Sequence, residues 1–210
     1  MDKSLKNIAI VLTAHPAQQK FWSPVLQCFE RYPGPMILSY DDIDLKQVPA
    51  DIIRRFDATE VTGYPPGQLG HGPGELVCMR NGFIAAAWSG YEFVVKIGFD
   101  TCLFFWRRLP EFFGQLRTVD IIDAKTAAIF GRTDALVKIM SGGDIETRKG
   151  SAESFYLSMA GKLQVKRKYM PGAWWFEQLG YIHLHGEYAL NAGKPIAWTW
   201  QIGELWPRQS

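Results

Sequence analysis

Short apolar runs of strand length, separated by segments with helical periodicity, limit the folds open to this sequence more than any other feature. The runs occupy residues 8–14, 36–40 and 91–97. A helical spacing of apolar residues marks 75–88, and the aromatic-rich segment 21–32 is also predicted to be helical. Strands that alternate with helices predict an α/β fold. We therefore expect a mainly parallel central sheet with helices on both faces, a three-layer sandwich.

The same alternation extends toward the C-terminus. Further strands are predicted at 60–62, 118–122, 126–130 and 196–200, and further helices at 133–140 and 151–163. The sequence has no internal repeat and no linker long enough to mark a second domain. A single domain spanning 1–210 is therefore predicted.

Two local patterns predict where helices begin. Ser23 and Pro24 suit the cap and the first position of the helix at 21–32. Residues 63–74 contain five glycines and three prolines, which predicts a loop that ends where the helix at 75–88 begins. The glycine-rich end of this loop could cradle a phosphate with its amides, although a plain loop is the simpler interpretation.

Charge and cysteine content exclude several protein classes. The net charge is only +2, which is too small to dictate a nucleic-acid or membrane partner. Cys28, Cys78 and Cys102 lie far apart and form no CxxC pair, so neither a disulfide framework nor a cysteine zinc site is indicated. We expect a reducing, cytoplasmic location. No apolar run approaches about 18 residues, so no transmembrane helix is expected.

Several common catalytic motifs are absent from the sequence, namely GxGxxG, GxxxxGK[ST], GxSxG, HExxH and CxxC. Their absence disfavours nicotinamide binding, P-loop phosphoryl transfer and α/β-hydrolase chemistry. Acidic residues instead follow predicted strands: Asp41 and Asp42 follow 36–40, and Asp100 follows 91–97. Ligands of parallel α/β sheets bind outside the carboxyl ends of the strands, so these acids are predicted to face a ligand.

Residues 74–100 resemble the nucleotide-sugar-dependent glycosyltransferases with a GT-A fold. In that family a helix with an Arg-Asn-x-Gly-like element leads into a strand that ends on an acidic D-x-D metal motif. Here Arg80 and Asn81 stand in the helix, and Gly98-Phe99-Asp100 takes the place of D-x-D. Only one of the two acids is present. The spacing from Lys96 to Asp100 is similar to a variant in some polysaccharide and lipopolysaccharide glycosyltransferases.

The resemblance implies a GT-A-like, Rossmann-related fold, with a nucleotide-binding half at about 1–100 and an acceptor-side half at about 101–210. It implies transfer of a hexosyl or pentosyl group from a nucleoside diphosphate sugar to a hydroxyl acceptor. The residues that would bind the donor are Thr13, His15, Asp41, Asp42, Arg80, Asn81 and Lys96. Arg80 would pair with the diphosphate, or it would bridge to a helix neighbour such as Glu75.

Asp100 is the candidate ligand of a divalent cation, Mn²⁺ or Mg²⁺, which would neutralise the departing diphosphate. Alternatively, it is an ordinary strand-end cap. His183 and His185 lie two residues apart, so on a strand they would share one face and could both reach a metal. On a helix they would diverge, and packed or exposed histidines are the commoner outcome.

An inverting transfer needs a carboxylate that takes the proton of the acceptor hydroxyl. Residues 128–134 and 151–156 resemble the acceptor side of the family, which makes Glu153 the first candidate base. Asp144, in a glycine-containing segment just before, is the second. The simpler interpretation of Glu153 is a solvated acid at a helix N-terminus.

A basic and aromatic run supplies an alternative function. Lys162, Lys166, Arg167 and Lys168 precede Tyr169 and a tryptophan pair, a composition that can hold phosphates and stack bases. A solvated basic helix end is the simpler interpretation. The alternatives are a nucleic-acid-binding module, or a transferase that glycosylates a hydroxylated base in DNA. Two acceptors therefore remain possible from the sequence, a glycan and modified DNA.

Overall fold

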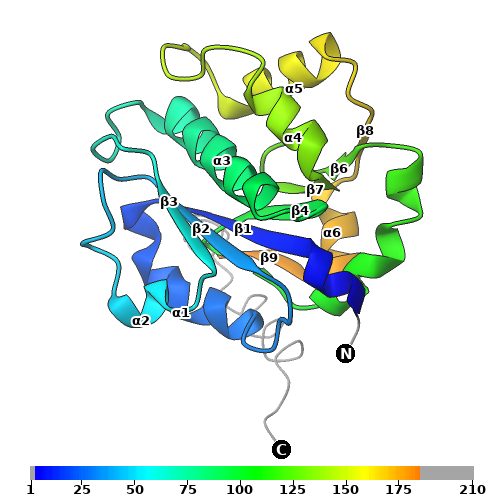
Figure 1. Cartoon of the computed structure of the whole chain (residues 1–210), viewed down its shortest axis with the longest axis horizontal. Coiled ribbons are helices and arrows are strands. Elements are labelled where there is room, and N and C mark those ends of the chain that lie inside the picture. The colour runs from blue at the N-terminus through cyan, green and yellow to red at the C-terminus, as the bar shows by residue number, and fades with distance from the viewer. Residues whose placement is uncertain (1–2, 185–210) are drawn as a thin grey trace, which may run out of the picture.

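A seven-stranded sheet forms the centre of the molecule, with the strand order β3-β2-β1-β4-β7-β6-β8 (Figure 1). The computed structural model describes residues 3–184, and for Lys3, His71, Phe176, Ile182 and His183 it describes the backbone only. The strands are β1 (Ile8–Ala14), β2 (Met36–Tyr40), β3 (Ala58–Val61), β4 (Phe93–Gly98), β6 (Ile121–Asp123), β7 (Ala128–Arg132) and β8 (Arg167–Tyr169). A second, two-stranded antiparallel sheet pairs β5 (Thr101–Leu103) with β9 (Tyr181–His183).

The central sheet is mainly parallel, as predicted. Strands β3, β2, β1 and β4 run parallel to one another, and β8 is parallel to β6. Strand β7 is antiparallel to both of its neighbours, β4 and β6. The carboxyl ends of β1, β2 and β4 therefore meet at one edge of the sheet, where ligands of such folds bind.

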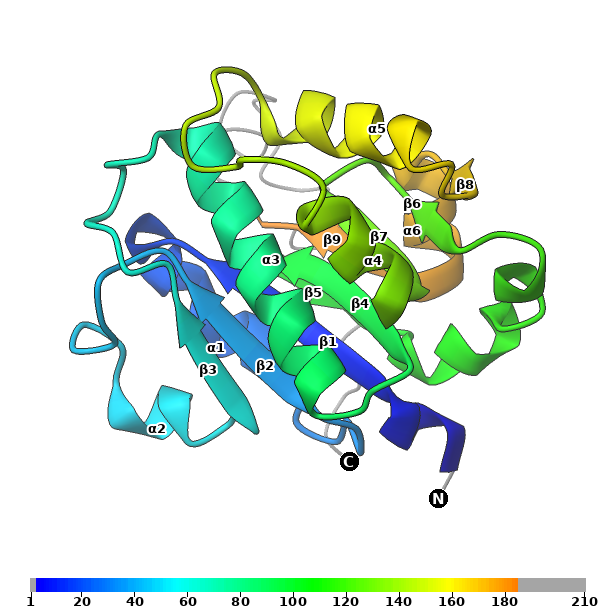
Figure 2. The ribbon, with the colours of Figure 1, turned by 45° about the horizontal axis from the view of Figure 1, so that its top comes forward.

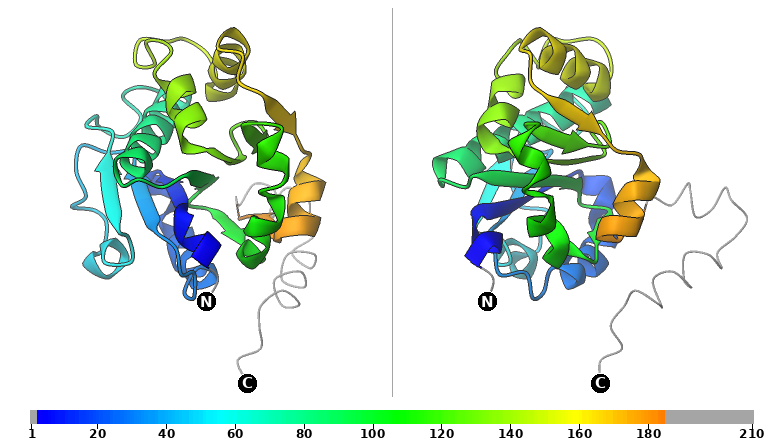
Figure 3. Two further views of the ribbon diagram at one scale, coloured as in Figure 1. Left: turned by 45° about the vertical axis from the view of Figure 1, so that its right-hand side comes forward. Right: turned by 90° about the vertical axis from the view of Figure 1, so that its right-hand side faces the viewer.

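Helices cover both faces of this sheet, which confirms the predicted three-layer arrangement (Figures 1 and 2). One face carries α3 (His71–Trp88), α4 (Thr133–Met140) and α5 (Ala152–Lys162). The other face carries α1 (Gln19–Cys28), α2 (Ala50–Ile53), α6 (Gly172–Leu179) and the 3-10 segment η3 (Trp106–Phe112). Figure 3 shows α6 beside η3, where the rings of Trp174 and Phe112 lie 5.1 Å apart. Shorter 3-10 turns occupy Lys3–Asn7, Pro16–Gln18 and Gln115–Arg117.

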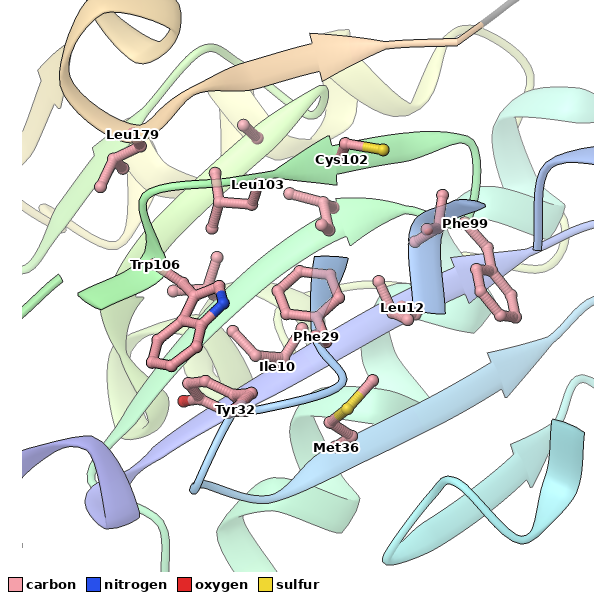
Figure 4. Close-up of a cluster of buried hydrophobic side chains, with 14 of the residues drawn as sticks. Ile10, Leu12, Phe29, Tyr32, Met36, Phe99, Cys102, Leu103, Trp106 and Leu179 are labelled. Carbon is pink, nitrogen blue, oxygen red and sulfur yellow. The ribbon is translucent and has the colours of Figure 1, made fainter. Parts of the chain in front are cut away.

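Strand β1 is buried along its whole length because its side chains alternate between two apolar layers. Ile8, Ile10 and Leu12 pack toward α1, and Ala9 and Val11 pack toward α3. In Figure 4, Ile10 and Leu12 lie among aromatic rings of the first layer. Full burial of each branched side chain contributes about 1.5–3 kcal/mol, so β1 anchors both cores.

Helix α1 begins earlier than the sequence suggested. Its first residue is Gln19, and Pro24 lies inside the helix, so the prediction that Ser23 and Pro24 start it was wrong. The reason is His15, whose Nδ1 accepts a hydrogen bond from the backbone of Ala17 at 3.1 Å. His15 thereby caps the 3-10 turn at Pro16–Gln18, and that turn leads directly into α1.

Helix α3 also begins earlier, at His71 rather than at residue 75, so the glycine-rich stretch is not entirely a loop. Pro73 is tolerated because the first turn of a helix needs no N–H there. Gly74 permits close contact with the residue that follows β2: a Cβ at this position would lie 3.0 Å from Asp41 Oδ2. Gly74 therefore reflects tight packing at the start of the helix.

Several other elements match the prediction closely. Strands β1 and β2 and helix α4 have the predicted bounds, and β3, β4, β7 and α5 differ by one or two residues at an end. Strand β6 begins three residues later than predicted, at Ile121. The strand predicted at 196–200 lies outside the described residues.

Strand β8 corrects the expectation of a basic helix end at 166–168. Asp123, at the end of β6, is fully buried and accepts hydrogen bonds from Arg167 at 2.5 and 2.8 Å. It also accepts one from the Tyr156 hydroxyl at 2.9 Å and one from the Lys125 backbone at 2.9 Å. Four donors satisfy this carboxylate, and together they fasten β8 and α5 to β6.

None of the helices between residues 3 and 184 is long and apolar enough to span a membrane.

We predict that Asp123→Ala lowers the free energy of unfolding by about 3 kcal/mol, because it leaves the Arg167 charge without its buried partner. Urea unfolding measures this change. Asp134→Ala is the control, since the Asp134 side chain is 77% exposed, and it should alter stability by less than about 1 kcal/mol. Equal losses from the two substitutions would contradict this role of Asp123.

Candidate active site

A cavity of about 410 Å³ opens at the carboxyl ends of β1 and β4, beside the first turns of α3. This volume is in the range of small-molecule sites. The lining residues come from six regions of the chain: Thr13, Ala14, His15, Gln18, Asp41, Glu75, Cys78, Lys96, Gly98, Asp100, Thr101, Thr126, Ala127 and Tyr181. Five of the predicted site residues therefore lie at one cavity, namely Thr13, His15, Asp41, Lys96 and Asp100.

Asp41 and His15 form one side of this cavity. The backbone N–H of Asp41 donates to Ala14 at 2.8 Å, and its carboxylate accepts from the Thr62 hydroxyl at 3.2 Å. His15 Nε2 lies 4.0 Å from Asp41 Oδ2. Because His15 Nδ1 is occupied as an acceptor, the neutral ring carries its proton on Nε2, facing the carboxylate.

Asp100 lies at the end of β4 and is only 2% exposed. Its Oδ2 accepts from the Gln18 side-chain amide at 2.8 Å, and its Oδ1 accepts from the Thr101 hydroxyl at 3.4 Å. A Cβ at Gly98 would lie 2.5 Å from Oδ1. The carboxylate of Asp100 thus occupies the space that a side chain at position 98 would need. This explains why glycine stands at position 98, where the D-x-D motif has its first aspartate.

Lys96 and Glu75 form a second charged group in the cavity. Lys96 Nζ donates to Glu75 Oε1 at 3.0 Å and to the Thr126 carbonyl at 2.6 Å. The side chain of Lys96 is 3% exposed and that of Glu75 is 24% exposed. A charge at such depth is stable only with an opposite charge and hydrogen bonds, and Glu75 and Thr126 supply them.

Two further side chains of the cavity stay neutral. Burial, together with the nearby Asp100 carboxylate, raises the pKa of the Tyr181 phenol to about 12. Burial also raises the pKa of the Cys78 thiol far above its usual range. Tyr181 therefore keeps its hydroxyl proton at neutral pH and can donate it in a hydrogen bond. Cys78 lines the cavity as a neutral thiol, which is unreactive because the thiolate is the nucleophile.

Three predicted donor-binding residues do not line this cavity. Arg80 pairs with Glu146 at 2.8 Å, rather than with the alternative partner Glu75. Asn81 donates its amide to the Val61 carbonyl at 2.9 Å, and Asp42 accepts from the backbone of Ile43 at 2.7 Å. Each of these contacts stabilises a loop or helix around the cavity.

The two candidate bases also lie outside the lining. Glu153 accepts from Lys125 at 2.9 Å, and this pairing raises the pKa of the Lys125 ammonium. Lys125 directly precedes the lining residue Thr126 in the chain, but neither Lys125 nor Glu153 lines the cavity. Asp144 accepts from the Thr147 hydroxyl at 2.7 Å, a bond that lowers the pKa of the Asp144 carboxyl.

The predicted metal ligands can be placed only in part. His183 belongs to strand β9, whose backbone pairs with Thr101 next to Asp100, and His185 lies outside the described residues. Among the residues whose side chains the structure describes, no group of three His, Cys, Asp or Glu could hold a metal ion. A hard cation such as Mg²⁺ needs only one or two carboxylates when a substrate supplies phosphate oxygens, and Asp100 fits that requirement.

Sequence analysis missed Gln18, Cys78, Thr101, Thr126, Ala127 and Tyr181 as lining residues, and it assigned Glu75 no place in the cavity. One signal was available for Thr101, because it directly follows the strand-end acid. The others reach the cavity through contacts between distant segments. The 21 positions that separate Glu75 from Lys96 leave no local pattern.

Comparisons with known proteins come from structure alone. No family model matches the sequence, and no curated protein matches it. A provisionally assigned nucleotide-diphospho-sugar transferase from Desulfovibrio desulfuricans G20 superposes with a TM-score of 0.53 at 13% identity, over 79% of this chain and 80% of that one.

Two other solved structures are more distant. The bifunctional IspDF from Campylobacter jejuni gives a TM-score of 0.44 at 11% identity, over 79% of this chain and 49% of that one. The glycosyltransferase GlyE of Streptococcus pneumoniae TIGR4 gives 0.49 at 10% identity, over 92% of this chain and 50% of that one. This chain thus matches only about half the length of these two proteins.

The first of these likenesses defines the class of the fold. The chain has a GT-A-like fold, the fold of a nucleotide-sugar transferase, with its cavity at the carboxyl ends of the parallel strands.

We predict that the pair between Arg80 and Glu146 stabilises the protein only above acid pH. Arg80 and the Tyr64 hydroxyl hold the pKa of the Glu146 carboxyl below its ordinary value. A lowered pKa means that the stabilisation is present above the unfolded-state pKa, about 4.3, and is lost as the pH falls through the folded-state pKa. Glu146→Gln should therefore lower the melting temperature at pH 7, and the difference from wild type should shrink toward pH 3.

The matched control is Glu111→Gln, which breaks an exposed ion pair with Arg108. It should lower the melting temperature less than Glu146→Gln at pH 7. A difference between Glu146→Gln and wild type that stays constant from pH 7 to pH 3 would contradict the prediction.

Proposed function

We propose that this protein is a glycosyltransferase that moves a hexosyl or pentosyl group from a nucleoside diphosphate sugar to a hydroxyl acceptor. One observation carries the proposal. The buried carboxylate of Asp100 and the strand-end residues Thr13, His15 and Asp41 border a single cavity. The likeness of the fold to a nucleotide-diphospho-sugar transferase supports it.

The donor occupies this cavity in our proposal. Thr13, His15 and Asp41 contact the nucleoside, with Asp42 shaping the loop behind Asp41. The diphosphate lies beside Asp100, between two neutral donors, the amide of Gln18 and the hydroxyl of Tyr181. Arg80 and Asn81 support the walls, since their hydrogen bonds go to Glu146 and Val61.

A divalent cation, Mn²⁺ or Mg²⁺, would be held by Asp100 and by diphosphate oxygens. Its chemistry there is neutralisation of the charge that develops on the leaving diphosphate. Asp100 is suited to this role because both of its carboxylate oxygens accept hydrogen bonds, from Gln18 and from Thr101, which orient the group. His183 and His185 remain proposed additional ligands.

In an inverting transfer, the acceptor oxygen loses its proton to a base, forms a bond to the anomeric carbon, and the bond to the diphosphate oxygen breaks. Glu153 remains our first proposed base, with Asp144 as the second. Glu153 is 40% exposed, and its pair with Lys125 would have to open for it to accept a proton from an acceptor near Thr126.

The acceptor is proposed to be a glycan or, as the second candidate, a hydroxylated base in DNA. The basic run offers limited support for DNA, because Arg167 is bound to Asp123 and Lys168 donates to Gln115 at 3.0 Å. Lys166, directly before the edge strand β8, and Tyr169, at the end of that strand, remain exposed. Binding to DNA through phosphates would weaken steeply as salt rises, and this separates the two acceptors.

Thermal unfolding with nucleoside diphosphates and nucleotide sugars, with and without Mn²⁺ or Mg²⁺, tests the proposal. A ligand at about 100 times its dissociation constant adds roughly 2.7 kcal/mol, which raises the melting temperature by about 5–10 °C. We expect such a shift with at least one nucleotide, and we expect it to depend on the metal.

Asp100→Asn should abolish the metal-dependent part of the shift and turnover, while the melting temperature without ligand stays close to that of wild type. Asp134→Asn, which alters an exposed carboxylate on α4, should keep both. The proposal fails if no nucleotide shifts the wild-type protein, or if Asp100→Asn transfers sugar at the wild-type rate.

A further inference from the structure

Lys96 occupies a position that the fold otherwise reserves for apolar side chains. Its neighbours in register are Val11 on β1 and Ile129 on β7, and both belong to the apolar layer beneath α3. A lysine in such a layer loses its hydration, and an ion pair there is often no more stable than two apolar side chains. The core alone therefore does not require a charge at this position.

The pair between Lys96 and Glu75 is incompletely satisfied. An ammonium group has three donors, and Lys96 uses two of them, on Glu75 and on Thr126. Glu75 uses Oε1 for Lys96, and within residues 3–184 its Oε2 has no partner. One donor and one acceptor are thus left over, and both residues line the cavity.

The order of the strands places this pair away from the nucleoside side. Asp41 follows β2, whereas Lys96 reaches toward Thr126, just before β7, and β1 and β4 lie between β2 and β7. Asp100 follows β4, which lies between β1 and β7 in the sheet. A donor whose nucleoside lies at β1 and β2, and whose diphosphate lies at Asp100, would direct its sugar toward Lys96 and Glu75.

We propose that Lys96 and Glu75 together bind two neighbouring hydroxyl groups of the donor sugar and so determine which sugar is accepted. This inference rests on the proposed function. Nζ of Lys96 and Oε1 of Glu75 are 3.0 Å apart, so the free donor and the free carboxylate oxygen form a short polar edge. Hydroxyl groups on adjacent ring carbons present a matching edge, since each hydroxyl both donates and accepts. A sugar without one of these hydroxyls leaves one hydrogen-bonding position of this ion pair unfilled.

The test compares affinity for a nucleoside diphosphate with affinity for its sugar conjugate, by calorimetry on the full chain. The probes are UDP, GDP, CDP and dTDP, each with its common hexose conjugates. In wild type we expect the sugar to add affinity. Glu75→Gln keeps the shape of the side chain but turns the free acceptor into a donor, so it should reduce that added affinity about 10- to 100-fold and leave nucleoside diphosphate binding unchanged.

A double variant separates recognition from folding. Lys96→Met combined with Glu75→Met replaces the pair by apolar side chains, and it should melt at or above the wild-type temperature while losing the added affinity of the sugar. The double variant should bind a deoxy analogue that lacks one of the two hydroxyls as tightly as it binds the parent conjugate. Lys138→Met is the control, since Lys138 is an exposed lysine on α4 that donates to Leu163.

The outcomes separate a failure of the proposed function from a failure of the role assigned to Lys96 and Glu75. If wild type binds no nucleoside diphosphate and no conjugate, the proposed function fails and this inference fails with it. If wild type binds both, but the double variant loses nucleoside diphosphate and conjugate equally or keeps its preference for the parent sugar over the deoxy analogue, the assignment of Lys96 and Glu75 alone is overturned.

Discussion

Strand β1, held in parallel register between β2 and β4, determines where the polar side chains of the site stand. Thr13 lies beside Ser39 on one neighbour and beside Gly98 on the other. The ladder continues beyond the strands, because Asp41 donates its N–H to Ala14 and Phe99 donates its N–H to Thr13, both at 2.8 Å. Asp41 and Asp100 are therefore brought to the same edge by backbone hydrogen bonds, and a slip of one residue would turn their side chains to the other face.

Two ion pairs next to the same sheet illustrate how burial separates a structural group from a binding group. Asp123 is fully buried, and four donors satisfy its carboxylate, so it fastens strands together and offers nothing to a ligand. Lys96 and Glu75 border a cavity and retain one donor and one acceptor. Similar charges in similar layers thus have different consequences, because only the second pair is left with unused hydrogen-bonding capacity.

Much of the fold could be predicted from local patterns, since the apolar runs of β1 and β2 and the periodicity of α4 need no tertiary information. The same holds for the acids that follow strands. Predictions failed where a distant segment decides. Glycines that ordinarily end helices begin α3 because Asp41 packs against Gly74. Arg167 looked solvated in sequence, but its partner Asp123 lies 44 positions away.

The site shows the same division. Thr13, His15, Asp41, Lys96 and Asp100 were predicted and lie together at the cavity. Arg80 was predicted from the family resemblance, whereas in the structure it is bound to Glu146, in a loop whose position no local pattern indicates. Glu75 was not predicted to line the cavity, because helical periodicity describes only which side of a helix is apolar and not which polar group will contact the other side.

The central claim is that the cavity at the carboxyl ends of β1, β2 and β4 binds the nucleoside diphosphate. Backbone amide NMR during titration with the nucleoside diphosphates, in the presence of Mg²⁺, tests this claim most directly. We expect saturable shifts concentrated at residues 13–15, 41 and 98–101. Saturable shifts centred on residues 166–169 instead, or the absence of any shift with every nucleotide, would contradict it.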